Sequence, residues 1–185
     1  MATPLGHALC GVMVGTAAAW RRPFLGPAKD LILFAALAQA PDLDFLPGIL
    51  LGNPDAFHHG ISHSLGFALI FGFILAWAGK SRGQALRWGL TSAAVYLAQV
   101  AVDAMTIDTR PPYGVPFWWP FSGAMVQSGS PIFLDVRRWS LDWPAVWHNL
   151  RAAGLEILVL GLPAGLVLWA RHRYAAGGGS LIQRG

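Results

Sequence analysis

Charged side chains are scarce in this chain. Asp, Glu, Lys and Arg make up 12% of its 185 residues, whereas 55% of the residues are hydrophobic. A soluble domain usually carries about 25% charged residues. The shortage argues against an ordinary soluble domain and predicts a membrane protein. We expect one membrane-embedded domain over residues 1–174, followed by a flexible, glycine-rich tail over residues 175–185.

Cysteine is almost absent as well. Cys10 is the only one, which excludes an internal disulfide and a zinc site built from several thiolates. Any metal ligands must therefore be imidazoles and carboxylates. The chain also lacks an H-E-x-x-H motif, which argues against a zinc peptidase. No basic residue precedes the first apolar run, and Arg21 and Arg22 follow it, so this run is not expected to be a signal peptide.

Long apolar runs, by contrast, are frequent. They cover residues 5–20, 31–40, 61–78, 86–107 and 152–170. The last three approach the roughly 20 residues that a helix needs to cross about 30 Å of hydrocarbon, and the first two are shorter. This pattern predicts an all-α fold, a multi-pass transmembrane helical bundle of about five helices. Residues 111–147 are rich in Pro, Gly and Trp, and we expect them to form an interfacial, aromatic-rich loop.

Basic residues are unevenly distributed around these runs. If each run crosses the bilayer, nine of them fall on one side and four on the other. The nine are Arg21, Arg22, Lys29, Lys80, Arg82, Arg87, Arg171, Arg173 and Arg184, and the four are Arg110, Arg137, Arg138 and Arg151. Because positive charge accumulates on the cytoplasmic side, we expect the N-terminus outside and the C-terminus in the cytoplasm. Topology thus explains the basic excess, and no nucleic-acid partner is expected.

Histidine and aspartate gather at the outer ends of the first four runs. The residues concerned are His7, Asp42, Asp44, His58, His59, His63 and Asp103. Ionisable groups are costly at membrane depth and persist when they pair or bind ions. Imidazoles and carboxylates without thiolates suit zinc, manganese or iron. The candidates exceed the needs of one tetrahedral site, so a pair of ions about 3.5–4 Å apart is also consistent with the pattern.

Neighbouring polar residues have predicted supporting roles. Ser62 is a candidate N-cap for the third helix. Gln99 and Asp103 are four residues apart and share one helix face, so Gln99 either orients Asp103 or takes a weak ligand position. Five further acids and one further histidine are expected in solvated loops or near the interface, with Asp108 a second-tier ligand candidate: Asp55, Asp108, Asp135, Asp142, His148 and Glu156.

The same motifs, in the same order, resemble those of a known family. They are a Gly-His pair at residues 6–7, PDLD at 41–44, HHGISHSL at 58–65, and Asp103 followed by YGVPFWWPFS at 113–122. The third is similar to a family H-R-G-x-T-H-S-L, and the last to a G-V-x-x-x-W-P-F block. Over its first two-thirds the chain resembles the YdjM-type membrane-bound metal-dependent hydrolases of bacteria. That family is thought to be related to the zinc-dependent phospholipase C/P1 nuclease group.

The resemblance implies a metal-dependent hydrolase of the bacterial inner membrane. It implies one or two divalent ions, zinc first, held by His7, Asp42, Asp44, His58, His63 and Asp103. Two positions depart from the family pattern. Gln99 replaces a family histidine, which bears on the occupancy of one metal. His59 replaces a family arginine, and this change either removes a phosphate-binding cation, adds a ligand or caps the helix.

The leading functional hypothesis is hydrolysis of a phosphoester or ester bond in a lipid-like substrate by metal-activated water at the non-cytoplasmic face. The catalytic candidates are Asp44, His59 and Arg110; Asp44 or Asp42 would bridge metals or take a proton, and Arg110 would steady an anionic substrate. The expected partners are the bilayer and a small lipid-like or phosphoester substrate. The alternative is a non-catalytic metal-binding membrane protein, structural or transporting.

Overall fold

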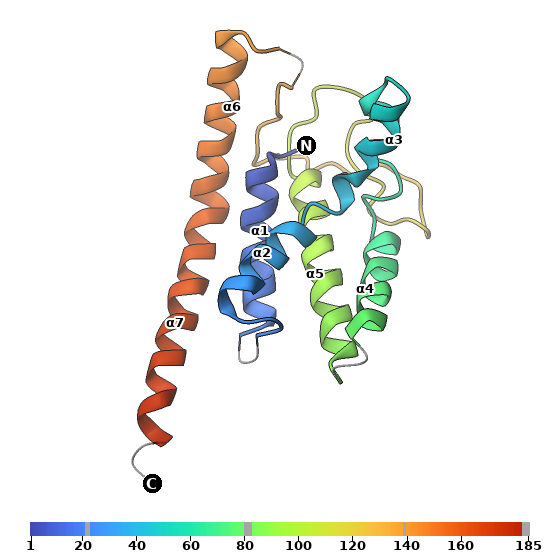
Figure 1. Cartoon of the computed structure of the whole chain (residues 1–185). Helices are drawn as coiled ribbons and strands as arrows, with labels where there is room; N and C mark the ends of the chain where they lie inside the picture. Colours follow the sequence, from blue (N-terminus) through green and yellow to red (C-terminus); the bar gives the residue numbers. More distant parts are fainter. Residues whose placement is uncertain (21–22, 80–82, 139, 183–185) are drawn as a thin grey trace.

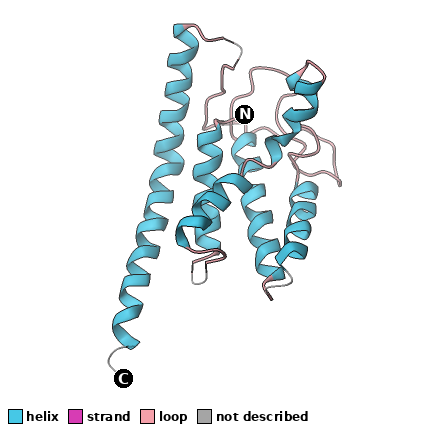
Figure 2. Cartoon of the chain, viewed as in Figure 1, coloured by secondary structure: helices cyan, strands magenta, loops and turns pink. Residues whose placement is uncertain are grey.

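The computed structural model describes residues 1–20, 23–79, 83–138 and 140–182 of the chain. In these ranges it contains helices, short turns and loops, and the only strand-like pairings are two isolated bridges (Figure 2). The all-α prediction is therefore confirmed. Within the described ranges the α-helices are α1 (Pro4–Ala18), α2 (Pro27–Leu37), α3 (Phe45–Leu50), α4 (Leu65–Gly79), α5 (Ala85–Ala104), α6 (Trp143–Glu156) and α7 (Leu162–Ile182).

The helices form six rods, because α6 and α7 are continuous through a short π-helical turn, η4 (Ile157–Gly161). The predicted number was about five, and α3 is the addition. Its six residues include Pro47, which a helix tolerates in its first turn because the missing N–H has no partner there. The segment is too short to show helical periodicity in the sequence. A 3-10 turn, η1 (Pro41–Asp44), precedes it.

Fewer helices qualify as membrane spans than the five predicted. By length and apolar composition one helix in the described residues qualifies, Trp143–Ala175, with 33 residues. A second qualifies if Pro27–Leu37 and Pro41–Leu50, bent by 41°, count as one broken span. The helices α1 and α4 are apolar but have 15 residues each. Such a helix is only about 22 Å long, which is less than the hydrocarbon thickness of about 30 Å.

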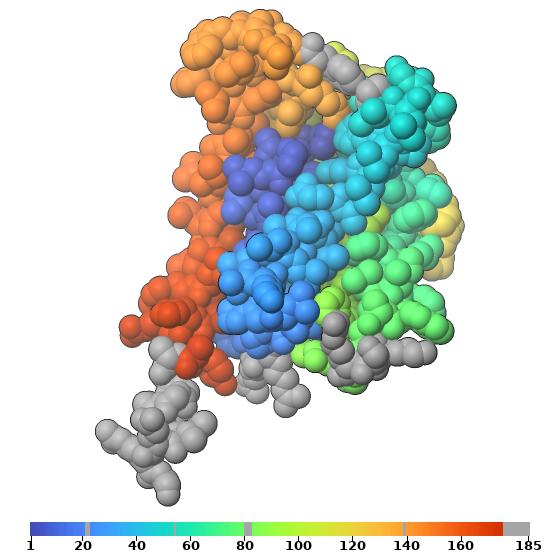
Figure 3. Space-filling model, in the orientation of Figure 1, coloured from blue at the N-terminus to red at the C-terminus, as the bar shows by residue number. Residues whose placement is uncertain are grey.

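The rods are arranged with their axes roughly along one direction (Figure 1). The α6–α7 rod flanks α1, and α4 lies along α5. The helices α4 and α5 pack so closely that Gly72 has no room for a side chain. A Cβ there would lie 2.7 Å from the carbonyl oxygen of Gly89. Figure 3 shows α2 and the segment after it crossing this face obliquely, between the α6–α7 rod and α4. Through this crossing the chain passes from one end of the bundle to the other, where η1 lies.

The start of α4 differs from the prediction. Ser64, and not Ser62, is the cap, because its Oγ accepts a hydrogen bond of 3.2 Å from the Phe67 N–H. The first free amides of the helix are satisfied by the loop that follows α5: Leu65 N–H donates to Phe117 O at 2.8 Å and Gly66 N–H to Trp119 O at 2.9 Å. The aromatic block of that loop therefore fixes the end of α4 that is nearest to the histidines.

Residues 106–142 contain no α-helix in the part that the structure describes. Two of the loop's aromatic side chains, Trp118 and Phe121, are exposed. At the other extreme of the chain, α7 continues to Ile182, and residues 183–185 of the predicted tail lie outside the described residues. So do five of the nine basic residues on the predicted cytoplasmic side: Arg21, Arg22, Lys80, Arg82 and Arg184.

Candidate metal centre

Four elements bring the predicted ligands to one layer of the molecule. His7 lies in the first turn of α1, Asp103 is the penultimate residue of α5, and η1 supplies two aspartates. The three other histidines lie on the turn before α4. The end of α5 and the start of α1 meet directly, since the backbone N–H of Ala2 donates to Asp103 Oδ1 at 2.9 Å. The structure brings together all six residues that the sequence suggested as ligands.

One group of potential ligand atoms consists of His7, Asp42 and Asp103. His7 Nδ1 lies 2.9 Å from Asp42 Oδ2, and His7 Nε2 lies 3.2 Å from Asp103 Oδ1. One ligand atom from each residue lies within 4.8 Å of the others. His7 and Asp103 are fully buried. These three residues could hold a metal ion.

A second group consists of His58, His59 and His63, which are all buried and also offer ligand atoms within 4.8 Å of one another. The two groups are contiguous. His63 Nε2 lies 3.3 Å from Asp42 Oδ1 and 3.5 Å from Asp103 Oδ2. This second group could hold an ion as well, and His63 stands between the two.

Asp44 contacts the Nδ1 edges of His58 and His63, whereas Asp42 and Asp103 lie on the Nε2 side of His63. Asp44 Oδ1 lies 3.2 Å from His58 Nδ1, and its Oδ2 lies 3.1 Å from His63 Nδ1. The Ser62 hydroxyl donates to Oδ2 at 2.7 Å. A carboxylate that binds Nδ1 fixes the ring and directs Nε2 toward a metal, as second-layer carboxylates commonly do. Asp44 is therefore placed to orient histidines from behind, whereas Asp42 reaches the Nε2 side of His63.

Several polar atoms in this layer are buried without a hydrogen-bond partner. They are Nε2 of His58, Nε2 of His59 and Oε1 of Gln99. An unpartnered buried polar group is costly, typically about 1–3 kcal/mol. All three can donate an electron pair to a cation. The residues therefore fit a divalent ion that accepts nitrogen and oxygen ligands.

The protonation of the histidines agrees with this fit. Burial lowers the pKa of His58, and lowers that of His59 well below its ordinary value, so both rings are neutral and able to ligate. Burial alone would also lower the pKa of His63. Hydrogen bonds with Asp103, Asp42 and Asp44 outweigh it and hold that pKa well above the ordinary value. Three carboxylates therefore surround this ring, and their negative charge favours a cation there, which is either the protonated imidazole or a bound ion.

His59 has a backbone conformation that non-glycine residues rarely adopt. Its φ of 57° is the one positive value among the non-glycine residues that the structure describes. Strain of this kind is often kept at functional sites. The suggestion that His59 caps the helix is wrong, because α4 begins at Leu65 with Ser64 as its cap. The His59 ring instead joins the other imidazoles, and its Nδ1 lies 3.6 Å from Asp108 Oδ2.

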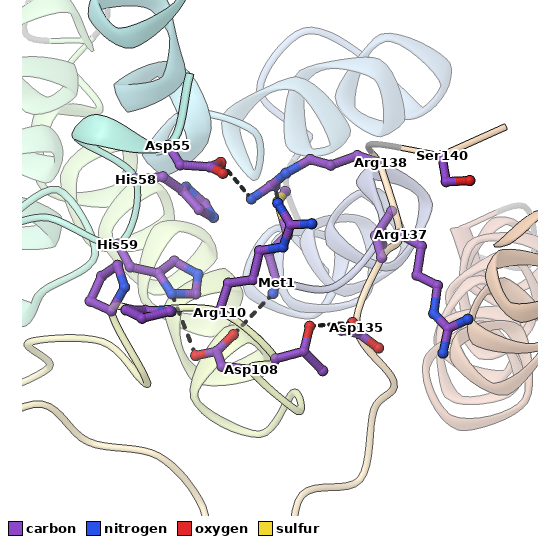
Figure 4. Close-up of a pocket in the computed structure, with 14 residues that line it drawn as sticks. Met1, Asp55, His58, His59, Asp108, Arg110, Asp135, Arg137, Arg138 and Ser140 are labelled. Atoms are coloured by element: carbon purple, nitrogen blue, oxygen red, sulfur yellow. Dashed lines mark hydrogen bonds and ion pairs between the residues drawn. The ribbon is translucent and has the colours of Figure 1, made fainter. Parts of the chain in front are cut away.

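A polar pocket of about 370 Å³ adjoins the histidines. Its lining includes His58, His59 and Arg110, so the predicted substrate-steadying arginine lies in a cavity that reaches the second histidine group (Figure 4). Arg138 crosses the pocket and pairs with Asp55 at 2.9 Å. Asp55, one of the predicted loop acids, is therefore part of a charged pocket wall.

Three polar residues have roles that the sequence reading missed. Glu156 is fully buried, and it accepts hydrogen bonds from the backbone N–H of Thr3 at 2.7 Å and from the Thr3 hydroxyl. This anchors the start of α1, one turn before His7. Asp135 pairs with His148 across 2.9 Å and lines the polar pocket. A lone acid in an apolar helix was the available signal for Glu156.

Fold and site together define an all-helical protein with one or two candidate membrane spans and a buried His/Asp centre able to hold metal. The chain matches the YdjM inner membrane protein family over residues 1–176, and it belongs to that family. The predicted membership is thereby confirmed, and with it an association with the inner membrane. No curated protein and no solved structure matches the chain.

Proposed function

We propose that this protein is a metal-dependent hydrolase that cleaves a phosphoester or ester bond of a lipid-like substrate. One observation carries the proposal: His58 and His59 have buried, unpartnered Nε2 atoms, and both residues line a cavity that also contains Arg110. A structural ion is closed off by its ligands, whereas a catalytic ion keeps an open position that substrate can reach. Ligand atoms beside a cavity favour the second case.

The residues divide into ligands and supports. His7, Asp42 and Asp103 would hold one ion, and His58 and His59 a second, with His63 between them (Figure 4 shows the second pair). A divalent ion such as zinc lowers the pKa of bound water toward about 7 and neutralises charge on a phosphoryl or acyl oxygen.

Other side chains orient these groups. Asp44 holds the Nδ1 atoms of His58 and His63, so we assign it a positioning role and not a place among the ligands. Asp42 has one oxygen toward His7 and the other toward His63, which suits it to bridging two ions. Arg110 supplies a fixed positive charge for an anionic substrate group.

The chain crosses the inner membrane several times in this proposal, with the His/Asp layer toward the non-cytoplasmic side. Figure 1 shows α1 and α4 running away from the labelled N-terminus, α2 and α5 running back, and α6–α7 running away again. Of the nine basic residues expected in the cytoplasm, the structure describes four, Lys29, Arg87, Arg171 and Arg173, and they lie toward the end opposite the layer, in the first turns of α2 and α5 and in α7. A bilayer accommodates helices as short as α1 and α4 by local thinning.

A non-catalytic metal-binding protein is the second candidate. Gln99 favours it, because an amide replaces a family histidine in contact with His7 and Asp103, and one ion could be weakly held. Transport is less consistent with the chain. Neither α4 nor α7 carries an acidic residue, so neither offers a carboxylate for a path to the cytoplasmic side.

Metal content of the purified protein tests the proposal first. Wild type in detergent should contain one or two equivalents of transition metal by elemental analysis, and His63→Ala combined with Asp42→Ala should remove it. His148→Ala is the matched control, because it deletes an imidazole paired with a carboxylate outside the layer. A wild type that holds no metal under reconstitution overturns the proposal.

Turnover separates the two candidates. Wild type should hydrolyse lipids from a panel of phosphoesters and esters in detergent. A chelator should abolish this hydrolysis, and added zinc should restore it. A metal-loaded protein with no turnover on the whole panel supports the structural alternative instead.

A further inference from the structure

A second, apolar cavity of about 630 Å³ lies beside the polar pocket. Its apolar walls come from η1 and the residue before it, from the turn before α4, from α4 and from α5: Ala40, Pro41, Leu43, Ala56, Phe57, Ile61, Phe67, Ile70, Phe71, Ile74 and Tyr96. Such a size and lining are typical of small-molecule sites. Unlike the polar pocket, it holds only Asp44 among charged side chains.

This apolar cavity, called the groove below, follows one face of α4. Phe67, Ile70, Phe71 and Ile74 recur at helical spacing and cover about 10 Å along the axis. Ile70 and Ile74 are 46% and 55% exposed, so the wall is open on the side that no described residue covers. When such a helix lies in a membrane, acyl chains of the bilayer cover an apolar face of this kind.

The groove and the polar pocket share a wall. His58, His59 and Pro112 line both. The two histidines with unpartnered Nε2 atoms therefore separate an apolar compartment from a charged one. A ligand that passes this wall has to be amphiphilic, with its polar group on the pocket side.

The pocket side is complementary to an anion. Figure 4 shows the guanidinium groups of Arg110 and Arg138 turned toward each other over the pocket. Arg138 pairs with Asp55 at 2.9 Å, and both guanidinium groups belong to the lining of the pocket. Arginine is well suited to binding phosphate oxygens through two parallel hydrogen bonds.

We propose that the groove binds an acyl chain of a membrane phospholipid, whose phosphate lies at the His58/His59 wall and faces Arg110 and Arg138. The inference rests on the proposed function and adds the orientation of the substrate. The chain would lie along α4, and the bond to be cleaved would lie where groove and pocket meet. Chain length then governs affinity, because each methylene adds apolar contact with the groove.

Lipid retention tests the proposal without relying on hydrolysis. Native mass spectrometry in detergent would measure binding of dipalmitoyl and dihexanoyl phosphatidylglycerol, which share one headgroup. Wild type should retain the long-chain lipid. Ile74→Trp, which fills the groove, should lower retention about tenfold or more. Leu69→Trp is the matched control, since Leu69 is 58% exposed on the same helix and does not line the groove.

Three results would overturn the proposal: equal retention by Ile74→Trp and Leu69→Trp, equal binding of the two lipids by wild type, or displacement of the long-chain lipid by inorganic phosphate alone. Metal content should be unchanged in both tryptophan variants, which shows that the centre is intact. If Ile74→Trp loses lipid while no lipid is hydrolysed by wild type, the binding mode stands and the proposed hydrolysis fails.

Discussion

The two ends of the bundle each bury an aspartate, and they satisfy it in different ways. At the end away from the histidines, Asp30 accepts hydrogen bonds from the backbone of Phe24 at 3.0 Å and Leu25 at 2.8 Å. Both donors lie within six residues of it, and Arg171 stands 3.9 Å away. At the other end, Asp103 is bound by His7, which is 96 residues away in the sequence, and by the N–H of Ala2.

The atoms left without partners also differ. Away from the histidines, the buried atoms of the described residues without a hydrogen-bond partner are Nη2 of Arg171 and Nε1 of Trp88, which can only donate, and the Thr16 hydroxyl oxygen. In the His/Asp layer the unpartnered atoms include imidazole nitrogens of His58 and His59, which can ligate a cation. A buried acid is therefore no sign of a site by itself. The kind of atom left unsatisfied near it distinguishes a structural cluster from a candidate metal centre.

The largest effect should come from removing one charge at each end. Asp103→Asn should weaken metal binding about 100-fold, because a ligand oxygen of the layer is lost. Asp30→Asn should leave metal content unchanged but lower the free energy of unfolding by about 3 kcal/mol, since Arg171 loses its buried partner. Competition titration with a chromophoric chelator and thermal unfolding in detergent measure the two quantities. Metal loss in Asp30→Asn would erase the distinction between the ends.

Two glycines on α1 allow a finer comparison. A Cβ on Gly6 would lie 2.6 Å from the Glu156 carboxyl carbon, and one on Gly15 would overlap the Phe34 ring. Both alanine variants should lower stability by about 1–3 kcal/mol through overpacking. Only Gly6→Ala should also weaken metal binding, about tenfold, because it displaces α1 beside His7. Gly165→Ala is the control.

That control lies in α7, where nothing is within 4 Å of the added methyl group. It should leave metal binding unchanged and, if anything, stabilise the helix by up to about 1 kcal/mol. If Gly6→Ala and Gly15→Ala weaken metal binding equally, the effect is global and the two ends are not independent.

The smallest effect is expected from a gain of one ligand. Gln99 donates to Asp103 Oδ2 at 2.5 Å, while its own Oε1 is unpartnered. Gln99→His places an imidazole where the structure has an amide beside His7 and Asp103, and it should raise metal affinity several-fold, up to about tenfold. Isothermal titration with zinc would measure the change. Gln99→Leu, which removes both functions of the amide, should move the affinity the other way, and a tighter-binding Leu variant would contradict the role given to Gln99.

Much of this layer was predictable from the sequence because helix ends alternate between two levels. Apolar runs place His7 and Asp103 at opposite ends of their helices, and antiparallel crossing then returns both to one level. The spacing of Gln99 and Asp103 gave their contact directly. These are one-dimensional properties of helices, and composition was enough to give the all-α class.

Contacts that depend on irregular backbone were not predictable. The positive φ of His59 and the cap at Ser64 follow from how the turn before α4 packs, which no periodicity encodes. The role of Asp44 on the Nδ1 side depends on the 3-10 turn η1, which the sequence analysis did not predict. Fewer helices than predicted qualify as spans by length, because α1 and α4 have only 15 residues each. The apolar run over residues 61–78 begins four residues before α4, in the turn that carries His63.

The continuous helix from Trp143 to Ala175 is longer than a bilayer is thick. Its 33 residues make a rod about 50 Å long, whereas the hydrocarbon layer is about 30 Å thick. Some turns must therefore stand in the headgroup region or beyond it. His148, near the start of this rod, holds Asp135 in the wall of the polar pocket. In the proposed topology, the helix that spans the bilayer therefore also holds one wall of the polar pocket, at a fixed distance along its axis from the apolar part.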